Sequence, residues 1–126
     1  MAIVLTPTEI NQFRQELANL APALIALEMV EACEGDLEDA AISLAIRVGQ
    51  EPDTSERWLE GVAKRWRHII CQLNLPSNSQ PEQVVKMVKA LTENTDIPPE
   101  LVTPVALYVF KAGVNNFCQP LSAKLV

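Results

Sequence analysis

The chain has 126 residues, of which 48% are hydrophobic and 21% are charged, and its formal net charge is -6 at pH 7. This length is typical of one domain with its own core, and the balance of apolar and charged residues excludes an intrinsically disordered chain. The acidic excess argues against a general nucleic-acid binder, because such proteins neutralise phosphates with Lys and Arg. The charge is uneven: residues 1–60 hold 12 acids and 3 bases, a net of -9, and residues 61–126 hold 4 acids and 7 bases, a net of +3.

Three helices are predicted in the first half of the chain. Residues 6–9, Thr-Pro-Thr-Glu, have the form of a capping box, and apolar residues then recur at helical spacing over 10–20. A proline begins a second helix over 22–34. Gly35 ends that helix, because glycine favours the conformation found at helix C-termini, and an aspartate caps a third helix over 36–48.

Three further helices are predicted at about 54–74, 81–94 and 99–117, and the first of these is the longest. Pro104 either kinks the last helix or restarts it, since proline has no backbone N–H. The last helix is apolar nearly all round, so it lies at the centre of the fold or carries a dimer interface. The predicted fold class is all-α: one compact domain over 1–126, a single bundle of five to six helices with short loops.

The three cysteines are Cys33, Cys71 and Cys118. Their odd number and the lack of a Cys-x-x-Cys motif fit reduced thiols in a cytoplasm better than a secreted disulfide framework. Residues 1–7 have neither the basic segment nor the long apolar segment of a signal peptide, and no apolar run reaches about 18 residues. We therefore expect a cytoplasmic protein that does not span a membrane.

Residues 31–41, EACEGDLEDAA, place five acids around one glycine. An EF-hand calcium loop beginning at Asp36 would need glycine sixth and glutamate twelfth, but these positions hold Ala41 and Arg47. Acids in the first turn of a helix are favoured by the helix dipole, so paired catalytic carboxylates are not needed to explain them. We expect a helical corner here, without a metal ion.

His68 and Cys71 lie one helical turn apart, which suits either a Cys–His nucleophile or the beginning of a metal site. The chain has no second histidine, and its other cysteines are distant in sequence. We therefore expect an exposed histidine beside a packed cysteine. No catalytic residue, cofactor or metal ligand is predicted, and the protein is not expected to be an enzyme.

The second and third predicted helices carry apolar residues outside their core faces. On the second helix two leucines are flanked by glutamates, and on the third helix two isoleucines lie roughly opposite the core stripe. Either neighbouring helices cover these residues or a partner protein does. The candidate protein-interaction residues are Leu24, Leu27, Glu28, Glu31, Ile42 and Ile46.

A basic run lies in the helix predicted over 54–74. Lys64, Arg65 and Arg67 are expected to fan over its solvent side, while Trp66 falls on the apolar stripe and is not placed to stack on bases. This basic face, over about residues 57–68, is either a solvated surface or a set of nucleic-acid contacts.

Residues 23–44, ALIALEMVEACEGDLEDAAISL, resemble the second and third helices of ubiquitin-associated-like three-helix domains, which include the N-terminal domain of bacterial elongation factor Ts. With the preceding helix the resemblance covers about 8–48. It implies binding of a partner protein through the loop at 19–22 and the end of the third helix. The residues that carry it are Ala23, Leu24, Gly35, Asp36, Glu38, Ala41 and Leu44.

The sequence therefore favours a small, non-enzymatic helical protein that binds another protein or itself as a homodimer, such as an adaptor or regulatory subunit. The alternative is a nucleic-acid-associated transcriptional regulator that uses the basic face. Neither function requires a cofactor.

Overall fold

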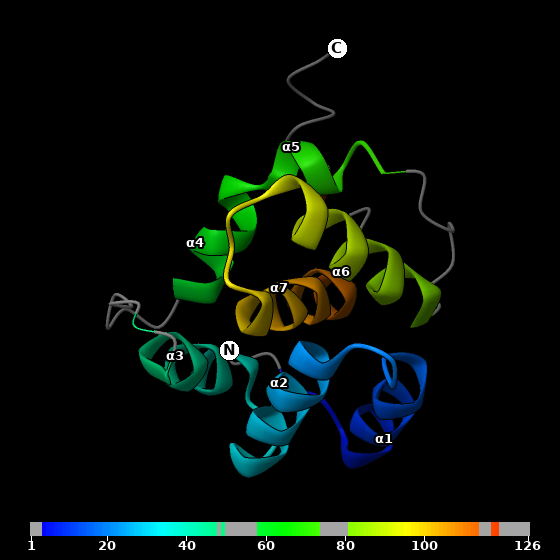
Figure 1. The fold of residues 1–126 in the computed structure, drawn as a ribbon, viewed down its shortest axis with the longest axis vertical. Helices are drawn as coiled ribbons and strands as arrows, with labels where there is room; N and C mark the ends of the chain where they lie inside the picture. Colours follow the sequence, from blue (N-terminus) through cyan, green and yellow to red (C-terminus); the bar gives the residue numbers. More distant parts are fainter. Residues whose placement is uncertain (1–3, 48, 50–57, 74–80, 114–116, 119–126) are drawn as a thin grey trace.

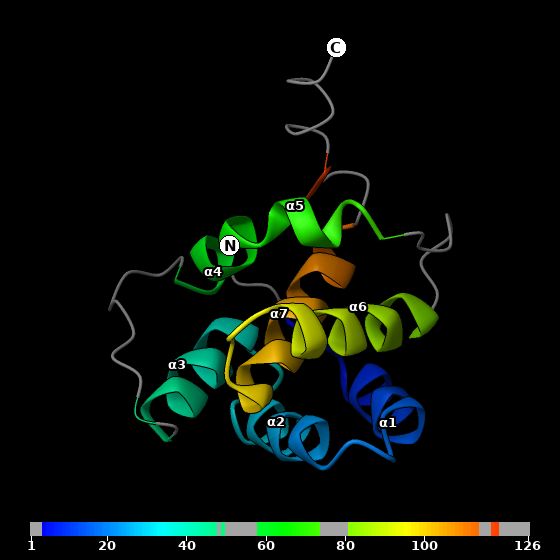
Figure 2. The ribbon, with the colours of Figure 1, turned by 45° about the horizontal axis from the view of Figure 1, so that its top comes forward.

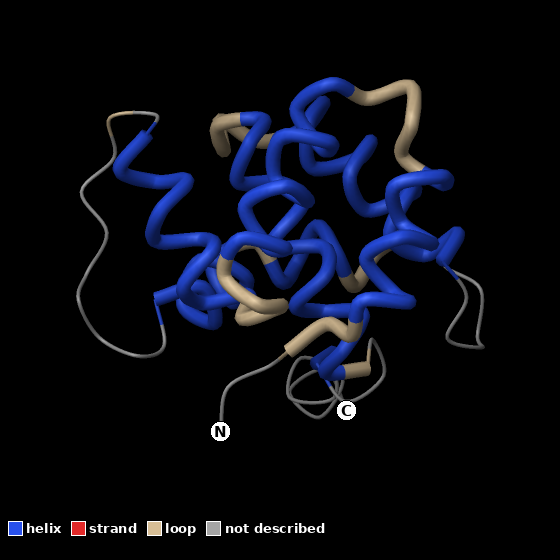
Figure 3. Tube along the Cα trace, turned by 90° about the horizontal axis from the view of Figure 1, so that it is seen from below, coloured by secondary structure: helices blue, strands red, loops and turns tan. Residues whose placement is uncertain are grey.

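The computed structural model describes residues 4–47, 49, 58–73, 81–113 and 117–118, and these contain seven α-helices (Figure 1). The described part has no β-sheet, only one isolated bridge between Val4 and Asp36, so the all-α class is confirmed (Figure 3). The expected count of five to six helices is too low, because the described part contains seven. None of the helices described is long and apolar enough to cross a membrane. In chain order the helices are α1 (Pro7–Glu16), α2 (Ala21–Ala32), α3 (Leu37–Arg47), α4 (Trp58–Arg65), α5 (Arg67–Ile70), α6 (Pro81–Asn94) and α7 (Pro99–Ala112).

Helix α7 lies at the centre of the fold and packs against α2, α3, α4 and α6 (Figures 1 and 2). Eight of its 14 residues are buried, as expected for a helix that is apolar on nearly every side. Of the two alternatives for this helix, the central position is therefore confirmed.

Pro104 lies inside α7 and does not end it, although it removes the bond that residue 104 would donate to residue 100. The helix ends at Ala112, earlier than the expected 117. Gly113 has a φ of 91°, and its N–H donates to the carbonyl oxygen of Val109 over 2.9 Å. A glycine in this left-handed conformation turns the chain away from the helix axis.

The long helix expected over 54–74 is wrong as one element, because the described part breaks at Trp66 into α4 and α5. The N–H of Trp66 donates to the carbonyl oxygen of Ala63, three residues back, over 3.2 Å. Trp66 is half-buried against the core, and the break has no Gly or Pro. The expected start of this helix at residue 54 lies outside the described residues, and the longest described helices are α6 and α7.

The corner between α2 and α3 follows the prediction, with one refinement. The side chain of Asp36 caps α3 by accepting the N–H of Asp39 over 3.1 Å. Gly35 has a φ of 89°, and its carbonyl oxygen accepts the N–H of Leu5 over 2.9 Å. The residue before it, Glu34, also has a left-handed backbone, with a φ of 57°. The helix thus ends through two successive left-handed residues, of which only one is glycine.

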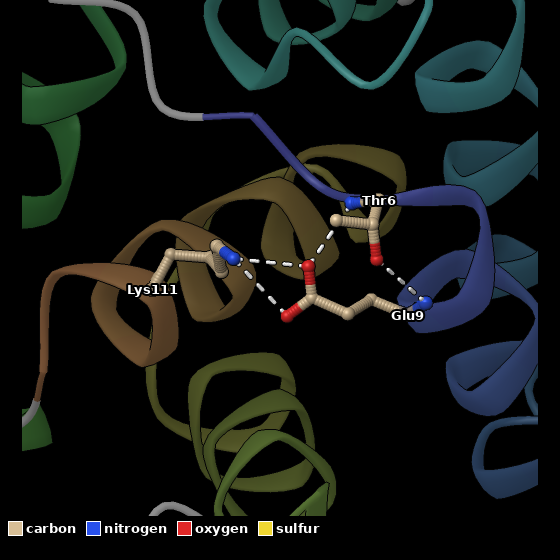
Figure 4. Close-up of polar contacts among 3 residues, drawn as sticks. All are labelled: Thr6, Glu9 and Lys111. Atoms are coloured by element: carbon tan, nitrogen blue, oxygen red, sulfur yellow. Dashed lines mark hydrogen bonds and ion pairs between the residues drawn. The ribbon is translucent and has the colours of Figure 1, made fainter.

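The predicted capping box at the start of α1 is confirmed. The Thr6 hydroxyl accepts the Glu9 N–H over 3.2 Å, and the Glu9 carboxylate accepts the Thr6 N–H over 3.0 Å. The same carboxylate accepts two hydrogen bonds from Lys111 at the end of α7 (Figure 4). A local cap therefore also attaches α1 to the central helix.

A disulfide joins Cys71, at the end of α5, to Cys118, with their Cα atoms 5.7 Å apart. The expectation of three reduced thiols is therefore wrong, and of the three only Cys33 is free. The N–H of Phe117 donates to the Gly113 carbonyl oxygen over 2.9 Å, and the next residue, Cys118, lies beside the end of α5. The expectation of a cytoplasmic location depended on reduced thiols and loses that support.

Candidate functional site

Helix α2 buries one of the residues predicted for protein interaction. Leu27 has an exposed fraction of 0%, because the buried arc of α2 also includes its neighbours Ala23, Ala26 and Val30. The prediction that Leu27 contacts a partner at the surface is therefore wrong, because Leu27 is a core residue. Leu24 is half-buried, while Glu28 and Glu31 are exposed.

The remaining candidates do not form one surface. Glu31 makes an ion pair with Arg14 of α1, and Leu24 lies two turns before Glu31 on the same side of α2. Helix α3 lies on the opposite side of α2 from α1 (Figures 1 and 2). On α3, Ile42 is half-buried and Ile46 is 65% exposed. The structure thus separates the α2 candidates from the α3 candidates.

A groove lies between the first turns of α1 and the end of α2, and we call it the acidic groove. Its volume is about 320 Å³, at the lower end of the range of ligand pockets. The floor is largely apolar, because Leu5 and Ile10 are buried beneath it. The lining residues are Leu5, Pro7, Ile10, Asn11, Glu31, Glu34 and Gly35.

The groove is called acidic because two exposed glutamates, Glu31 and Glu34, are among the residues that line it. Arg14 bonds to Glu31 and also donates to the Asn11 side-chain oxygen over 3.3 Å. A surface ion pair of this kind neutralises one of the two carboxylates and contributes little stability. The groove therefore keeps one negative charge in excess, beside an apolar floor.

Sequence reasoning included Glu31 among the candidates but missed the rest of the acidic groove. The walls come from segments about 25 residues apart in sequence, which meet because Leu5 bonds to the backbone of Gly35. Sequence patterns did mark both walls of the groove, because a capping box and a Gly-Asp corner each fix the end of a helix. No local pattern states that the two ends are neighbours.

The predicted basic face is divided. Arg67 places its guanidinium carbon 4.8 Å from the centroid of the Phe117 ring and is half-buried, so its expected position on the solvent side is wrong. Lys64 and Arg65 are exposed in the last turn of α4. The break at Trp66 separates them from Arg67, and contact of Lys64 and Arg65 with nucleic acid stays a prediction.

The possible pairing of His68 with Cys71 does not form, because the Cys71 sulfur is bonded to Cys118. His68 is exposed, with its ring centroid 6.2 Å from that of Trp66. Within the described ranges, no group of three or more His, Cys, Asp or Glu side chains is placed to hold a metal ion.

No family model, curated protein or solved structure matches this chain. The resemblance of residues 8–48 to ubiquitin-associated-like domains stays a prediction from sequence. In the structure α7 packs against α2 and α3, and α6 packs against α1, so the first three helices share their core with the rest of the fold. The function has to be inferred from the geometry of the surface.

Proposed function

We propose that this protein is a non-enzymatic protein-binding domain whose acidic groove receives a segment of a partner protein. The bound segment places one apolar side chain on the floor of the groove and a basic residue beside it. The observation that supports this proposal is the combination of a largely apolar floor with two exposed glutamates among the lining residues. Burial of the apolar side chain supplies affinity, and the remaining negative charge, that of Glu34, selects the basic neighbour.

The backbone of Glu34 gives a second reason to regard the groove as functional. A residue with a φ of 57° at the end of a helix is favoured to be glycine, and a side chain there costs about 1 kcal/mol. The cap does not require the carboxylate of Glu34, a residue that lines the groove. Left-handed residues are common at helix ends, but the cost of a non-glycine residue there supports a functional role for Glu34.

The polar groups of the groove suit recognition more than catalysis. They are the amide of Asn11 and the carboxylates of Glu31 and Glu34. Acid–base catalysis by two carboxylates needs unequal environments, usually with one of them buried, whereas both of these are exposed. The charge of residues 1–60, a net of -9, also favours approach of a basic partner.

The proposal is tested by titrating the isotope-labelled protein with a capped arginine–leucine–arginine peptide and recording amide chemical shifts. We expect changes at Ile10, Asn11 and Gly35, and weaker binding of the matched glutamate–leucine–glutamate peptide. Glu34→Lys should weaken binding of the basic peptide about fivefold, as expected for a charge at the rim of an interface.

The control variant is Glu28→Lys, which makes the same charge change on an exposed residue of α2 that does not line the groove. It should alter the affinity by less than about twofold. Shift changes that cluster around Lys64 or elsewhere, or equal losses in the two variants, contradict a site in the acidic groove.

Self-association through α3 is the second candidate. Ile46 is the most exposed of the large hydrophobic residues described, and Ile42 lies one turn before it. Two isoleucines on the outer side of one helix are suited to pack against the same pair of a second copy. This surface is separate from the acidic groove, so both forms of binding can occur together.

A further inference from the structure

Helix α5 is the shortest of the described helices. It has four residues, and among the described helices it packs only against α4 and α6. One of its residues, Ile70, is buried. The disulfide from Cys71 to Cys118 is the covalent link between α5 and the chain beyond α7. A short element with little buried surface opens at a low free-energy cost unless such a link restrains it.

Several contacts meet at this link. The N–H of Cys71 donates to the carbonyl oxygen of Arg67 over 2.9 Å, so Arg67 lies one turn before the cysteine. The Arg67 guanidinium lies over the ring of Phe117, which precedes Cys118 and is 6% exposed. The Arg67 Nε is buried without a hydrogen-bond partner in the described part of the chain. The guanidinium of Arg67 is therefore partly removed from water, and its cation–π contact with Phe117 stabilises it there.

Both bonded cysteines pack against the core and are half-buried, so part of each residue faces solvent. A small thiol has to reach one of the two sulfur atoms from that side. Thiol–disulfide exchange at such a bond is reversible.

We propose that the Cys71–Cys118 disulfide is a redox latch, which thiols of the glutathione type open to release Phe117 from Arg67 and α5. The disulfide gains two electrons and two protons and becomes the Cys71 and Cys118 thiols. Two molecules of the small thiol supply them and are oxidised to one small-molecule disulfide. The first step is attack of a small thiolate on one cysteine sulfur, which gives a mixed disulfide that a second thiolate then resolves.

The third cysteine, Cys33, is not expected to take part in the exchange. Burial raises the pKa of the Cys33 thiol, the hydrogen bond with Ser43 opposes this, and the nearby Asp39 and Asp36 carboxylates raise the pKa further. Its pKa remains above the ordinary value, so Cys33 is a poor nucleophile and does not compete in the exchange. A Cys33→Ser variant should therefore keep the whole response.

The latch is tested by hydrogen exchange on the full chain, with and without reduced glutathione, after counting free thiols. The protein purified without reductant should contain one free thiol, and glutathione should raise this to three. Exchange of the Cys71 and Phe117 amides, which donate to Arg67 and Gly113, should then accelerate at least about tenfold. The Gly35 amide, which donates to Val30 in the α2–α3 corner, is the internal reference and should stay unchanged.

Two variants separate the latch from a general effect of reductant. Cys118→Ser should show fast exchange at Cys71 with or without glutathione, and Cys33→Ser should respond like the natural sequence. Three free thiols before reduction overturn the proposal, as do unchanged Cys71 and Phe117 amides after it. Loss of protection at Gly35 together with the others also overturns it, because the disulfide would then hold the whole fold. These outcomes do not depend on whether the acidic groove binds a peptide.

Discussion

Lys111 at the end of α7 donates hydrogen bonds to both carboxylate oxygens of Glu9 in the first turn of α1, over 2.9 and 3.1 Å (Figure 4). The two residues are 102 positions apart in sequence. Because Glu9 also caps its own helix through Thr6, one carboxylate joins the start of the chain to the central helix. The same turn of α1 carries Pro7 and Ile10 into the acidic groove.

The Glu9–Lys111 pair predicts a pH-dependent contribution to stability. Partial burial raises the pKa of Glu9, but hydrogen bonds from Thr6 and Lys111 and the Lys111 charge outweigh this, so the pKa lies below the ordinary 4.5. When folding lowers the pKa of a carboxyl group, the group stabilises the folded state at any pH above its ordinary pKa. This stability is lost as the pH falls through the pKa of the folded state.

Lys111→Met should therefore reduce the free energy of unfolding by about 0.5–1 kcal/mol at pH 7, measured by urea denaturation. The deficit should shrink as the pH falls below 4.5 and through the folded pKa of Glu9. Lys89→Met, which removes an exposed lysine of α6, should have a smaller effect. A deficit that is the same at every pH would contradict the pair.

Substitution of two glycines should change stability in opposite directions. A Cβ added to Gly35 would lie 2.2 Å from the Leu5 carbonyl oxygen, and the backbone there has a φ of 89°. Gly35→Ala should cost about 2–3 kcal/mol, because the residue is strained and the Leu5 segment must move. Gly61, inside α4, has nothing within 4 Å of such an atom. Gly61→Ala should therefore raise stability by about 0.5–1 kcal/mol in the same denaturation assay. Equal effects would refute this account of the corner.

Glu34→Gly should improve stability and impair binding. Glycine relieves the left-handed backbone at a φ of 57°, so the free energy of unfolding should rise by about 1 kcal/mol. Loss of the carboxylate should weaken binding of the arginine–leucine–arginine peptide about twofold, less than the charge reversal in Glu34→Lys. Denaturation and peptide titration of one preparation measure both effects. If the variant is more stable and binds unchanged, Glu34 has no role in recognition.

Ile46→Asp tests self-association through α3. If two copies meet at the exposed Ile46, the mass from light scattering should rise with concentration toward that of a dimer. The aspartate should return the mass to that of a monomer, since a buried unpaired charge opposes association. Ala21→Asp, which introduces the same charge at an exposed residue of α2, is the matched control. A natural-sequence protein that remains monomeric at every concentration rules out this interface.

The features predicted well from sequence are those set by local chemistry. The capping box at Thr6, the cap at Asp36 and the apolar α7 each depend on residues within a few turns of one another. Such patterns constrain the backbone whatever the rest of the fold does. They were enough to predict the all-α class and the central position of α7.

The features that were missed depend on contacts between distant segments. No Gly or Pro marks the break at Trp66, a residue that packs against the core. The Cys71–Cys118 bond joins residues 47 positions apart, and cysteine spacing does not reveal that they meet. Leu27 was placed on the surface because the buried arc of α2 is wider than the hydrophobic spacing indicated.

The central claim is that the acidic groove recognises a basic segment by charge as well as by apolar contact. Its most direct test is a charge exchange: the affinities of the basic and the acidic tripeptide are measured for the natural protein and for Glu34→Lys. The natural protein should prefer the basic peptide, and Glu34→Lys should lower that preference about tenfold or reverse it. The variant removes an attractive charge for the basic peptide and supplies one for the acidic peptide. An unchanged preference in the variant would contradict the acidic groove as the site of recognition.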